Sequence, residues 1–208
     1  MNEENDRAVF LAAHDVSRET LDRLDSVIAT LDDWRLKSNL IGPREWPHIW
    51  QRHVWDCLQL LDHIPETARV VDLGSGAGFP GLIIAAARPQ GHVTMIESVG
   101  KKAAFLRAAI LAGHLPADVI QGRVESAEAE PADIVTARAF APLPRLLDYA
   151  APWMKKGATG LFLKGERWEE ELTEARQRWN FAYEAIPSRS GGSGVVLIVR
   201  ELRGGDES

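Results

Sequence analysis

The chain has 208 residues, of which 45% are hydrophobic and 26% are charged, a composition that argues against a disordered or fibrous protein. The net charge of −6 argues at first against a nucleic-acid partner, because phosphate binding depends on Lys and Arg. The charge is unevenly distributed, however: residues 1–66 carry 7 basic and 13 acidic side chains, residues 67–165 carry 11 and 8, and residues 166–208 carry 6 and 9. Only the middle part is basic.

The same features predict a cytoplasmic protein. The first ten residues, MNEENDRAVF, are acidic where a signal peptide would be basic, and no apolar run approaches the roughly 20 residues of a membrane-spanning helix. The lone Cys57 can form neither an internal disulfide nor a cysteine-rich zinc site. His53 and Cys57, four residues apart, lack a third ligand, so no metal is expected.

Residues 1–66 are expected to form a helical cap. Ser17 suits the N-cap of a helix, and the apolar side chains that follow it recur at spacings of three and four as far as about Lys37. After a break rich in Gly and Pro, a second helix fits residues 47–63, because Pro47 is tolerated in a first turn.

From residue 67 onward, short strands alternate with helices. We expect strands near residues 69–73, 92–97, 117–121, 132–137, 159–163, 181–186 and 194–200. Helices fit between them near residues 80–87, 100–113, 143–152 and 166–179. This alternation predicts a parallel sheet covered by helices on both faces.

The last connection, PSRSGGSG, is too short for a helix, so the final strand should run antiparallel to its predecessor. The predicted fold class is therefore α/β, with a Rossmann-like, seven-stranded and mostly parallel sheet whose last strand is antiparallel. This sheet is typical of class I S-adenosylmethionine-dependent methyltransferases. We expect residues 67–208 to form that domain and the cap to pack on it as one compact unit.

A glycine-rich loop follows the first predicted strand. Gly74, Gly76 and Gly78 lie where open α/β sheets bind ligands, and glycine leaves no Cβ between backbone and ligand. The spacing from Gly76 to Gly81, with Glu97 as a ribose acid, formally matches a dinucleotide fingerprint. A tight turn without a ligand is the other alternative.

Asp72 argues for a different ligand. In the dinucleotide register it would be a buried, unpaired carboxylate in mid-strand, which is expensive. If the strand instead stops near Asp72 or Leu73, the carboxylate stands at its open end and favours a cationic ligand such as S-adenosylmethionine. Glu97, at the end of the second strand, can accept hydrogen bonds from ribose hydroxyls, and Val124 and Glu125 lie where an adenine edge would be read.

Several stretches together resemble one family. DLGSGAGFPG, ESVGKKAAFLRAA, GRVE, ARAFAPLPRLL and FLKG, preceded by NLIG and WQRHVWDC, are similar to the RsmG (GidB) family of bacterial 16S ribosomal RNA methyltransferases, over about residues 34–165. The resemblance implies methyl transfer from S-adenosylmethionine to N7 of one guanine in the loop near the decoding site, the 530 loop. The expected partner is 16S rRNA or the small ribosomal subunit, with no membrane involved.

The matching motifs also imply which residues bind the cofactor: Gly74, Phe79, Val124, Glu125 and Arg138. Two positions depart from the family pattern. Cys57 stands where the family usually has Ser, and ARAF replaces the commoner SRAF, so Ala137 cannot supply that hydroxyl.

Guanine N7 carries an in-plane lone pair, so no proton must leave before it attacks. We therefore expect no catalytic residue in the strict sense, only groups that align the reactants. Basic residues at strand ends, in the loops beyond them and on the preceding helix are expected to bind RNA: Arg52, Lys101, Lys102, Arg123, Arg145 and Lys164. Arg52 and Asp56, four apart on the second helix, are expected to pair.

Two other functions remain open at this point. One is a methyltransferase that acts on a protein or a small molecule. The other is a nucleotide-binding protein without methyl transfer, such as a dehydrogenase.

Overall fold

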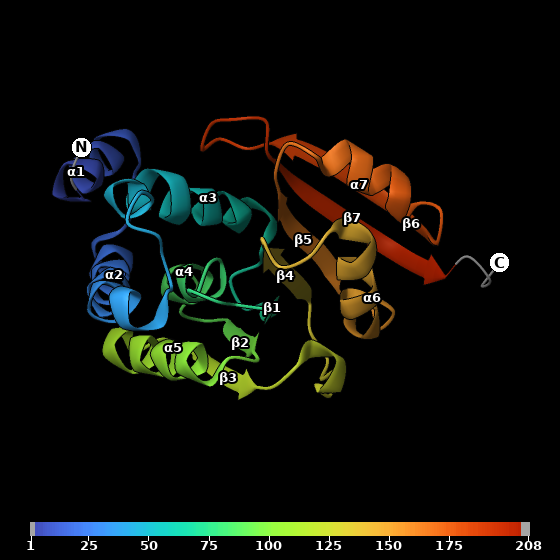
Figure 1. Cartoon of the computed structure of the whole chain (residues 1–208), viewed down its shortest axis with the longest axis horizontal. Helices are drawn as coiled ribbons and strands as arrows, with labels where there is room; N and C mark the ends of the chain where they lie inside the picture. Colours follow the sequence, from blue (N-terminus) through green and yellow to red (C-terminus); the bar gives the residue numbers. More distant parts are fainter. Residues whose placement is uncertain (1–2, 205–208) are drawn as a thin grey trace.

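The computed structural model describes residues 3–204 and contains one seven-stranded sheet (Figure 1). The strands are β1 (Arg69–Leu73), β2 (His92–Glu97), β3 (Ala117–Gln121), β4 (Ile134–Arg138), β5 (Thr159–Lys164), β6 (Trp179–Pro187) and β7 (Val195–Gly204). They lie in the order β3-β2-β1-β4-β5-β7-β6. Strands β1 to β5 pair in parallel, and β7 is antiparallel to both β5 and β6. The predicted fold class is confirmed.

Helices cover both faces of the sheet (Figure 1). They are α4 (Gly81–Ala87), α5 (Gly100–Gly113), α6 (Leu143–Met154) and α7 (Trp168–Ala175). Helices α4 and α5 share a hydrophobic cluster with Val70, whereas α6 and α7 share another with Val71, because successive side chains of a strand point to opposite faces. Helix α7 is shorter than the predicted helix 166–179, since Trp179 already begins β6.

The N-terminal region contains one helix more than the sequence pattern predicts. Helix α2 (Arg18–Ser38) is the expected one, and the Ser17 Oγ accepts a hydrogen bond from the Thr20 N–H at 3.2 Å, as an N-cap does. Helix α1 (Glu3–Ala13) precedes it. Its buried Asp6 accepts a hydrogen bond from the Trp50 N–H at 2.7 Å, which docks α1 on the helical segment that follows α2.

That segment is the predicted second helix, but it is not a regular α-helix. It passes through a 3-10 turn (Trp46–His48), a π-helix (Ile49–Val54), α3 (Trp55–Leu58) and another 3-10 turn (Gln59–His63). A π-helix is bonded between residues i and i+5 and has wider turns than an α-helix. The segment therefore does not place its side chains as one regular α-helix would.

The N-terminal helices and the sheet share a hydrophobic core. One cluster runs from Phe10 of α1 and Leu24 of α2 to Leu82 of α4 and Met95 of β2. The division of the chain at residue 66 stays a prediction. Within residues 3–204, no helix is both long and apolar enough to cross a membrane.

Candidate functional site

The glycine loop between β1 and α4 has a backbone that only glycine adopts easily. Gly74, Gly76 and Gly78 have φ values of 66°, 55° and 83°, all in the left-handed region. A Cβ at Gly74 would overlap the Phe140 ring, and a Cβ at Gly78 would overlap the Leu82 side chain. The protein's own side chains thus fill the space over Gly74 and Gly78, whereas a Cβ at Gly76 would meet nothing closer than 3.7 Å, so the backbone is open at Gly76.

Glu97 holds this loop against the neighbouring strand. The side chain lies at the end of β2 and is only 5% exposed. Its Oε2 accepts a hydrogen bond from the Gly76 N–H at 2.9 Å, and its Oε1 accepts one from the Val99 N–H at 2.7 Å. Each carboxylate oxygen keeps a second lone pair, so Glu97 can still receive a ligand hydroxyl.

Asp72 lies elsewhere than the sequence suggests. Strand β1 does end at Leu73, but the Asp72 carboxylate is fully buried and does not stand open beside a ligand. Its Oδ1 accepts a hydrogen bond from the Thr136 hydroxyl at 3.1 Å, and a Cβ at Gly81 would lie 2.8 Å from its Oδ2. The first turn of α4 thus covers the carboxylate, which corrects the expectation of direct contact with a cation. Asp72 supports the loop from beneath.

Burial gives Asp72 a measurable signature. Desolvation raises the pKa of Asp72 from 3.8 to about 7, and Oδ2 has no hydrogen-bond partner within residues 3–204. Between these two pH values the unfolded chain releases this proton while the folded chain keeps it, so the contribution of Asp72 to stability falls as pH rises towards 7. We expect the free energy of unfolding of Asp72→Asn, measured relative to that of the wild type, to be larger at pH 8 than at pH 5. Urea unfolding of both proteins at pH 5 and at pH 8 checks this, and the same difference at both pH values would contradict it.

The predicted adenine-reading residues lie beyond β3. Val124 and Glu125 belong to a 3-10 turn (Val124–Ser126), with Val124 buried and Glu125 exposed. The pKa of Glu125 is lowered, first by a backbone hydrogen bond within the residue and further by Tyr149 and by the charges of Arg123 and Arg145. The lowered pKa favours the ionised form of Glu125, and a carboxylate accepts hydrogen bonds from donor groups such as the amino group of an adenine.

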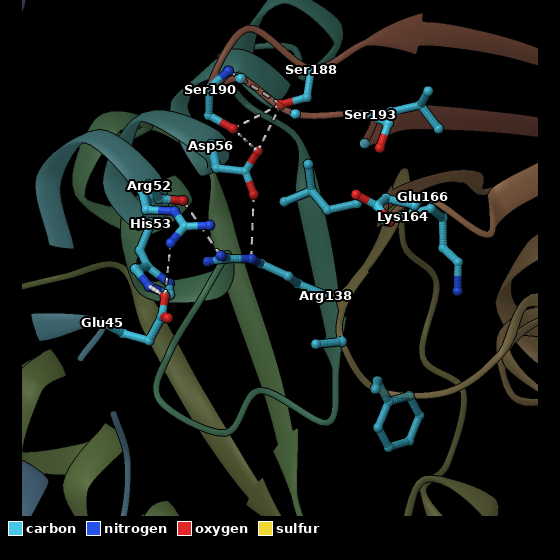
Figure 2. Close-up of a pocket in the computed structure, with 18 of the residues that line it drawn as sticks. Glu45, Arg52, His53, Asp56, Arg138, Lys164, Glu166, Ser188, Ser190 and Ser193 are labelled. Atoms are coloured by element: carbon cyan, nitrogen blue, oxygen red, sulfur yellow. Dashed lines mark hydrogen bonds and ion pairs between the residues drawn. The ribbon is translucent and has the colours of Figure 1, made fainter. Parts of the chain in front are cut away.

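A cavity of 960 Å³ opens at the carboxyl ends of β4 and β5 (Figure 2). Its walls come from three regions: the helical segment at residues 45–56, the ends of β4 and β5 with the turns after them, and the β6–β7 connection at residues 188–194. Ala139, which follows β4, has a φ of 50° although it is not glycine. Strained backbone of this kind persists where the surrounding structure holds it, and it gathers at functional sites.

Arg138 links the glycine loop to this cavity. Its guanidinium carbon lies 5.7 Å from the centre of the Phe79 ring, and Phe79 directly follows Gly78. Its Nε lies 3.3 Å from Asp56 Oδ2, and its Nη2 donates a hydrogen bond to the Arg52 carbonyl at 3.4 Å (Figure 2). The Arg138 side chain is only 19% exposed. It is therefore a fixed positive group between the two parts of the site.

His53 lies beside the same arginine and is held neutral. Burial, with the charge of Arg138 as the second cause, lowers the pKa of His53 to about 4. Glu45 acts in the opposite direction, since its Oε2 lies 3.3 Å from the His53 Nε2. Its ring centroid is 5.4 Å from that of Phe79. The expected Arg52–Asp56 pair does not form, since the Asp56 carboxylate faces Arg138 and Ser188. Arg52 instead approaches Glu45 at 3.8 Å.

The predicted RNA-binding residues follow the ends of several strands, and most are exposed. Lys101 and Lys102 lie in the first turn of α5, which follows β2, and Arg123 follows β3. Arg145, in the first turn of α6, is exposed and donates a hydrogen bond to the Tyr149 hydroxyl at 2.5 Å. Arg52 is 62% exposed at the cavity. RNA binding by this set stays a prediction.

Lys164 differs from the rest of this set. Its side chain is 9% exposed, and its Nζ lies 2.5 Å from Glu171 Oε2 and donates a hydrogen bond to the Ala141 carbonyl at 3.0 Å. The amine is already paired, so it shapes the wall of the cavity in this conformation and is not open to a phosphate.

The model of the family described as GidB, rRNA small subunit methyltransferase G, matches residues 20–191. The chain belongs to the GidB family. The resemblance that the motifs indicated is thereby confirmed.

Two relatives carry the name ribosomal RNA small subunit methyltransferase G. The one from Hyphomonas neptunium is 78% identical over 202 residues, which cover 97% of this chain and 98% of the relative. The one from Bradyrhizobium sp. is 46% identical over 201 residues, which cover 94% and 90%. The crystal structure of an O-methyltransferase from Bacillus cereus in complex with SAH has a TM-score of 0.56 at 16% identity, covering 85% of this chain and 91% of that one. That likeness shows the fold.

Three contributors to the site were not predicted from the sequence. Asp56 was expected to pair with Arg52 but contacts Arg138, and Glu45 was not singled out. The serines of the PSRSGGSG connection, which indicated only a short turn, line the cavity. The clustering of Ser and Gly there was the available signal. Among residues 3–204, no group of three or more His, Cys, Asp or Glu side chains gathers where it could hold a metal ion.

Proposed function

We propose that this chain transfers a methyl group from S-adenosylmethionine to N7 of a guanine in 16S ribosomal RNA, within the 530 loop. The observation that carries the proposal is the bridge formed by Arg138, which contacts Phe79 of the glycine loop on one side and lines the cavity on the other. A methyl donor above the loop and a base in the cavity would meet at this arginine. The names of the relatives supply the class of substrate.

The residues at the glycine loop fit this cofactor. The loop presents open backbone at Gly76, where a Cβ would have no neighbour nearer than 3.7 Å, and Glu97 offers free lone pairs beside it. Val124 and Glu125 would face the adenine ring. When bound, S-adenosylmethionine supplies an electrophilic methyl group on a sulfonium.

The protein's own part in the reaction is alignment. Guanine N7 needs no base, because its lone pair lies in the ring plane. Holding two reactants in line contributes about 7–11 kcal/mol in favourable cases. Arg138 and Phe140, which flank the strained Ala139, would orient the base, and no side chain needs to take up a proton.

The exposed basic side chains, Arg52 at the cavity and Lys101, Arg123 and Arg145 after the neighbouring strands, would position the RNA backbone. Phosphate contacts fix orientation without reading sequence, so they suit a folded RNA or an assembled subunit equally. A protein with this substrate would work in the cytoplasm, where ribosomal subunits are assembled.

The proposal is tested by offering labelled S-adenosylmethionine and the purified protein to small ribosomal subunits, to naked 16S rRNA and to a cell protein extract. Label in RNA supports it, and label in protein alone supports the alternative of a protein methyltransferase. A third arm titrates the protein with NAD. Tight NAD binding without binding of S-adenosylmethionine would favour a nucleotide-binding protein and contradict methyl transfer.

Replacing Lys101 and Lys102 together by Glu should weaken RNA binding about tenfold or more, because phosphate contacts dominate affinity. Binding of S-adenosylmethionine should change far less. Fluorescence titration with RNA and calorimetry with the cofactor measure the two affinities. The matched control is the same change at Lys155 and Lys156, which follow α6 and precede the amino end of β5, whereas Lys101 and Lys102 follow the carboxyl end of β2. Equal losses of both affinities would point to misfolding instead.

A further inference from the structure

Asp56 lies where three distant segments of the chain meet (Figure 2). It belongs to α3, and its side chain is 15% exposed. Each of its oxygens faces a different segment. Oδ2 lies 3.3 Å from Nε of Arg138 at the end of β4, whereas Oδ1 accepts hydrogen bonds from the β6–β7 connection. Within residues 3–204, no other carboxylate that lines the cavity contacts both segments.

The contacts of Oδ1 fix the loop at residues 188–194. The Ser188 hydroxyl donates to Oδ1 at 3.0 Å, and the Ser190 hydroxyl donates to it at 2.8 Å. Gln59 reinforces the contact, since its Nε2 donates to the same oxygen at 2.9 Å and its Oε1 accepts from the Arg189 N–H at 3.0 Å. The loop has glycines at positive φ, at Gly191 and Gly192, so its own backbone does little to fix its course.

The contact of Oδ2 fixes the guanidinium. Arg has several rotatable bonds, and an ion pair with Asp56 at 3.3 Å in a mostly buried place restricts their arrangement. Without Asp56, Arg138 would lose its carboxylate partner and keep weaker contacts, such as those to the Arg52 carbonyl and the Phe79 ring. Oδ2 of Asp56 therefore holds Arg138 and Oδ1 holds the loop at residues 188–194, and a base would enter between these two walls of the cavity.

We infer that Asp56 is a positioning residue for methyl transfer: it acts through Arg138 on the reaction and through Ser188 and Ser190 on the binding of RNA. This inference rests on the proposed function, because it assigns the cavity to the base that is methylated. It predicts that loss of the contact with Arg138 changes kcat, whereas loss of the contacts with the serines changes KM for RNA.

The Arg138 end is tested by a double-mutant cycle on full-length protein. Asp56→Asn keeps the size of the side chain and an acceptor oxygen but removes the charge that faces Arg138. We expect it to lower kcat for RNA methylation about tenfold to a hundredfold, as misplacement of an aligning group does. In an Arg138→Ala background the same change should alter kcat less than about twofold, because the group through which it acts is gone.

The Ser end is tested by the double variant with Ser188→Ala and Ser190→Ala. It should raise KM for RNA about fivefold or more, because the loop loses the hydrogen bonds that hold it to Asp56. It should leave kcat within about twofold, because the contact between Asp56 and Arg138 is unchanged. The matched control is Asp62→Asn. Asp62 pairs with Arg189 of the same loop at 2.7 Å, but both side chains are about half exposed, so its loss should change neither constant.

The outcomes distinguish the inference from the proposed function. If the wild type labels no RNA, the proposed function fails. If the wild type labels RNA but Asp56→Asn lowers kcat equally with and without Arg138, or Asp62→Asn matches Asp56→Asn, the positioning role is wrong. Thermal unfolding of each variant reports whether it is folded. Should Asp56→Asn unfold, the serine variant alone decides: a raised KM with unchanged kcat supports the inference, and unchanged constants overturn it.

Discussion

Arg138→Ala should lower kcat/KM for RNA methylation about a hundredfold or more, the scale on which loss of alignment slows an enzyme. The side chain touches Phe79 beside the glycine loop, pairs with Asp56 and lines the cavity, so its removal disturbs cofactor and base together. Initial rates with small subunits or 16S rRNA measure the effect, and calorimetry with S-adenosylmethionine reports the share that belongs to cofactor binding.

A second arginine provides the control for this experiment. Arg178 pairs with Asp148 at 2.9 Å on a surface away from the cavity, and its side chain is 69% exposed. Arg178→Ala removes the same groups from the chain, yet it should leave the rate unchanged. A rate within about threefold of the wild type for Arg138→Ala would mean that this arginine neither orients the base nor holds the cofactor.

Gly78→Ala should destabilise the fold by about 2–4 kcal/mol and abolish cofactor binding, because it combines overpacking with left-handed backbone strain. The new Cβ would overlap the side chain of Leu82, which is fully buried, so Leu82 would have to shift within a packed core. Urea unfolding gives the free energy of unfolding, and calorimetry gives the affinity for S-adenosylmethionine.

Gly76→Ala separates the two causes. Gly76 also has a positive φ, but a Cβ there would lie 3.7 Å from its nearest neighbour, the Gly74 carbonyl, which is an ordinary contact. Its cost should therefore be that of the backbone alone, about 1–2 kcal/mol. Equal losses of stability for Gly76→Ala and Gly78→Ala would show that the Leu82 contact is unimportant.

The sheet was predictable because its determinants are local. The predicted bounds are those of the structure for strands β1, β2 and β3, since each is a short run bounded by turn residues. They also hold for helix α5, which ends at Gly113. The antiparallel β7 followed from the length of one connection. Helix α1 was not predicted because it is held by a tertiary contact. Asp6 accepts a hydrogen bond from Trp50, more than forty residues away, and a local sequence pattern does not reveal such a contact.

The site was predictable by position but not by contact. The glycines, Glu97 and Arg138 lie at the carboxyl ends of their strands, as strand topology requires. The orientation of each side chain was not available from spacing. Asp72 points beneath α4, Lys164 pairs with Glu171, and Asp56 crosses to Arg138, and each outcome depends on partners brought together only by the folded chain.

Chemical mapping of the methylated nucleotide tests the proposed reaction most directly. Small ribosomal subunits that lack the modification are incubated with the purified protein and S-adenosylmethionine, and the 16S rRNA is then treated with borohydride and aniline, which cleave at N7-methylguanine. We predict one new cleavage site, at a guanine of the 530 loop, that requires both protein and cofactor. Label that enters protein alone, or RNA that is labelled without becoming cleavable, would contradict methyl transfer to guanine N7.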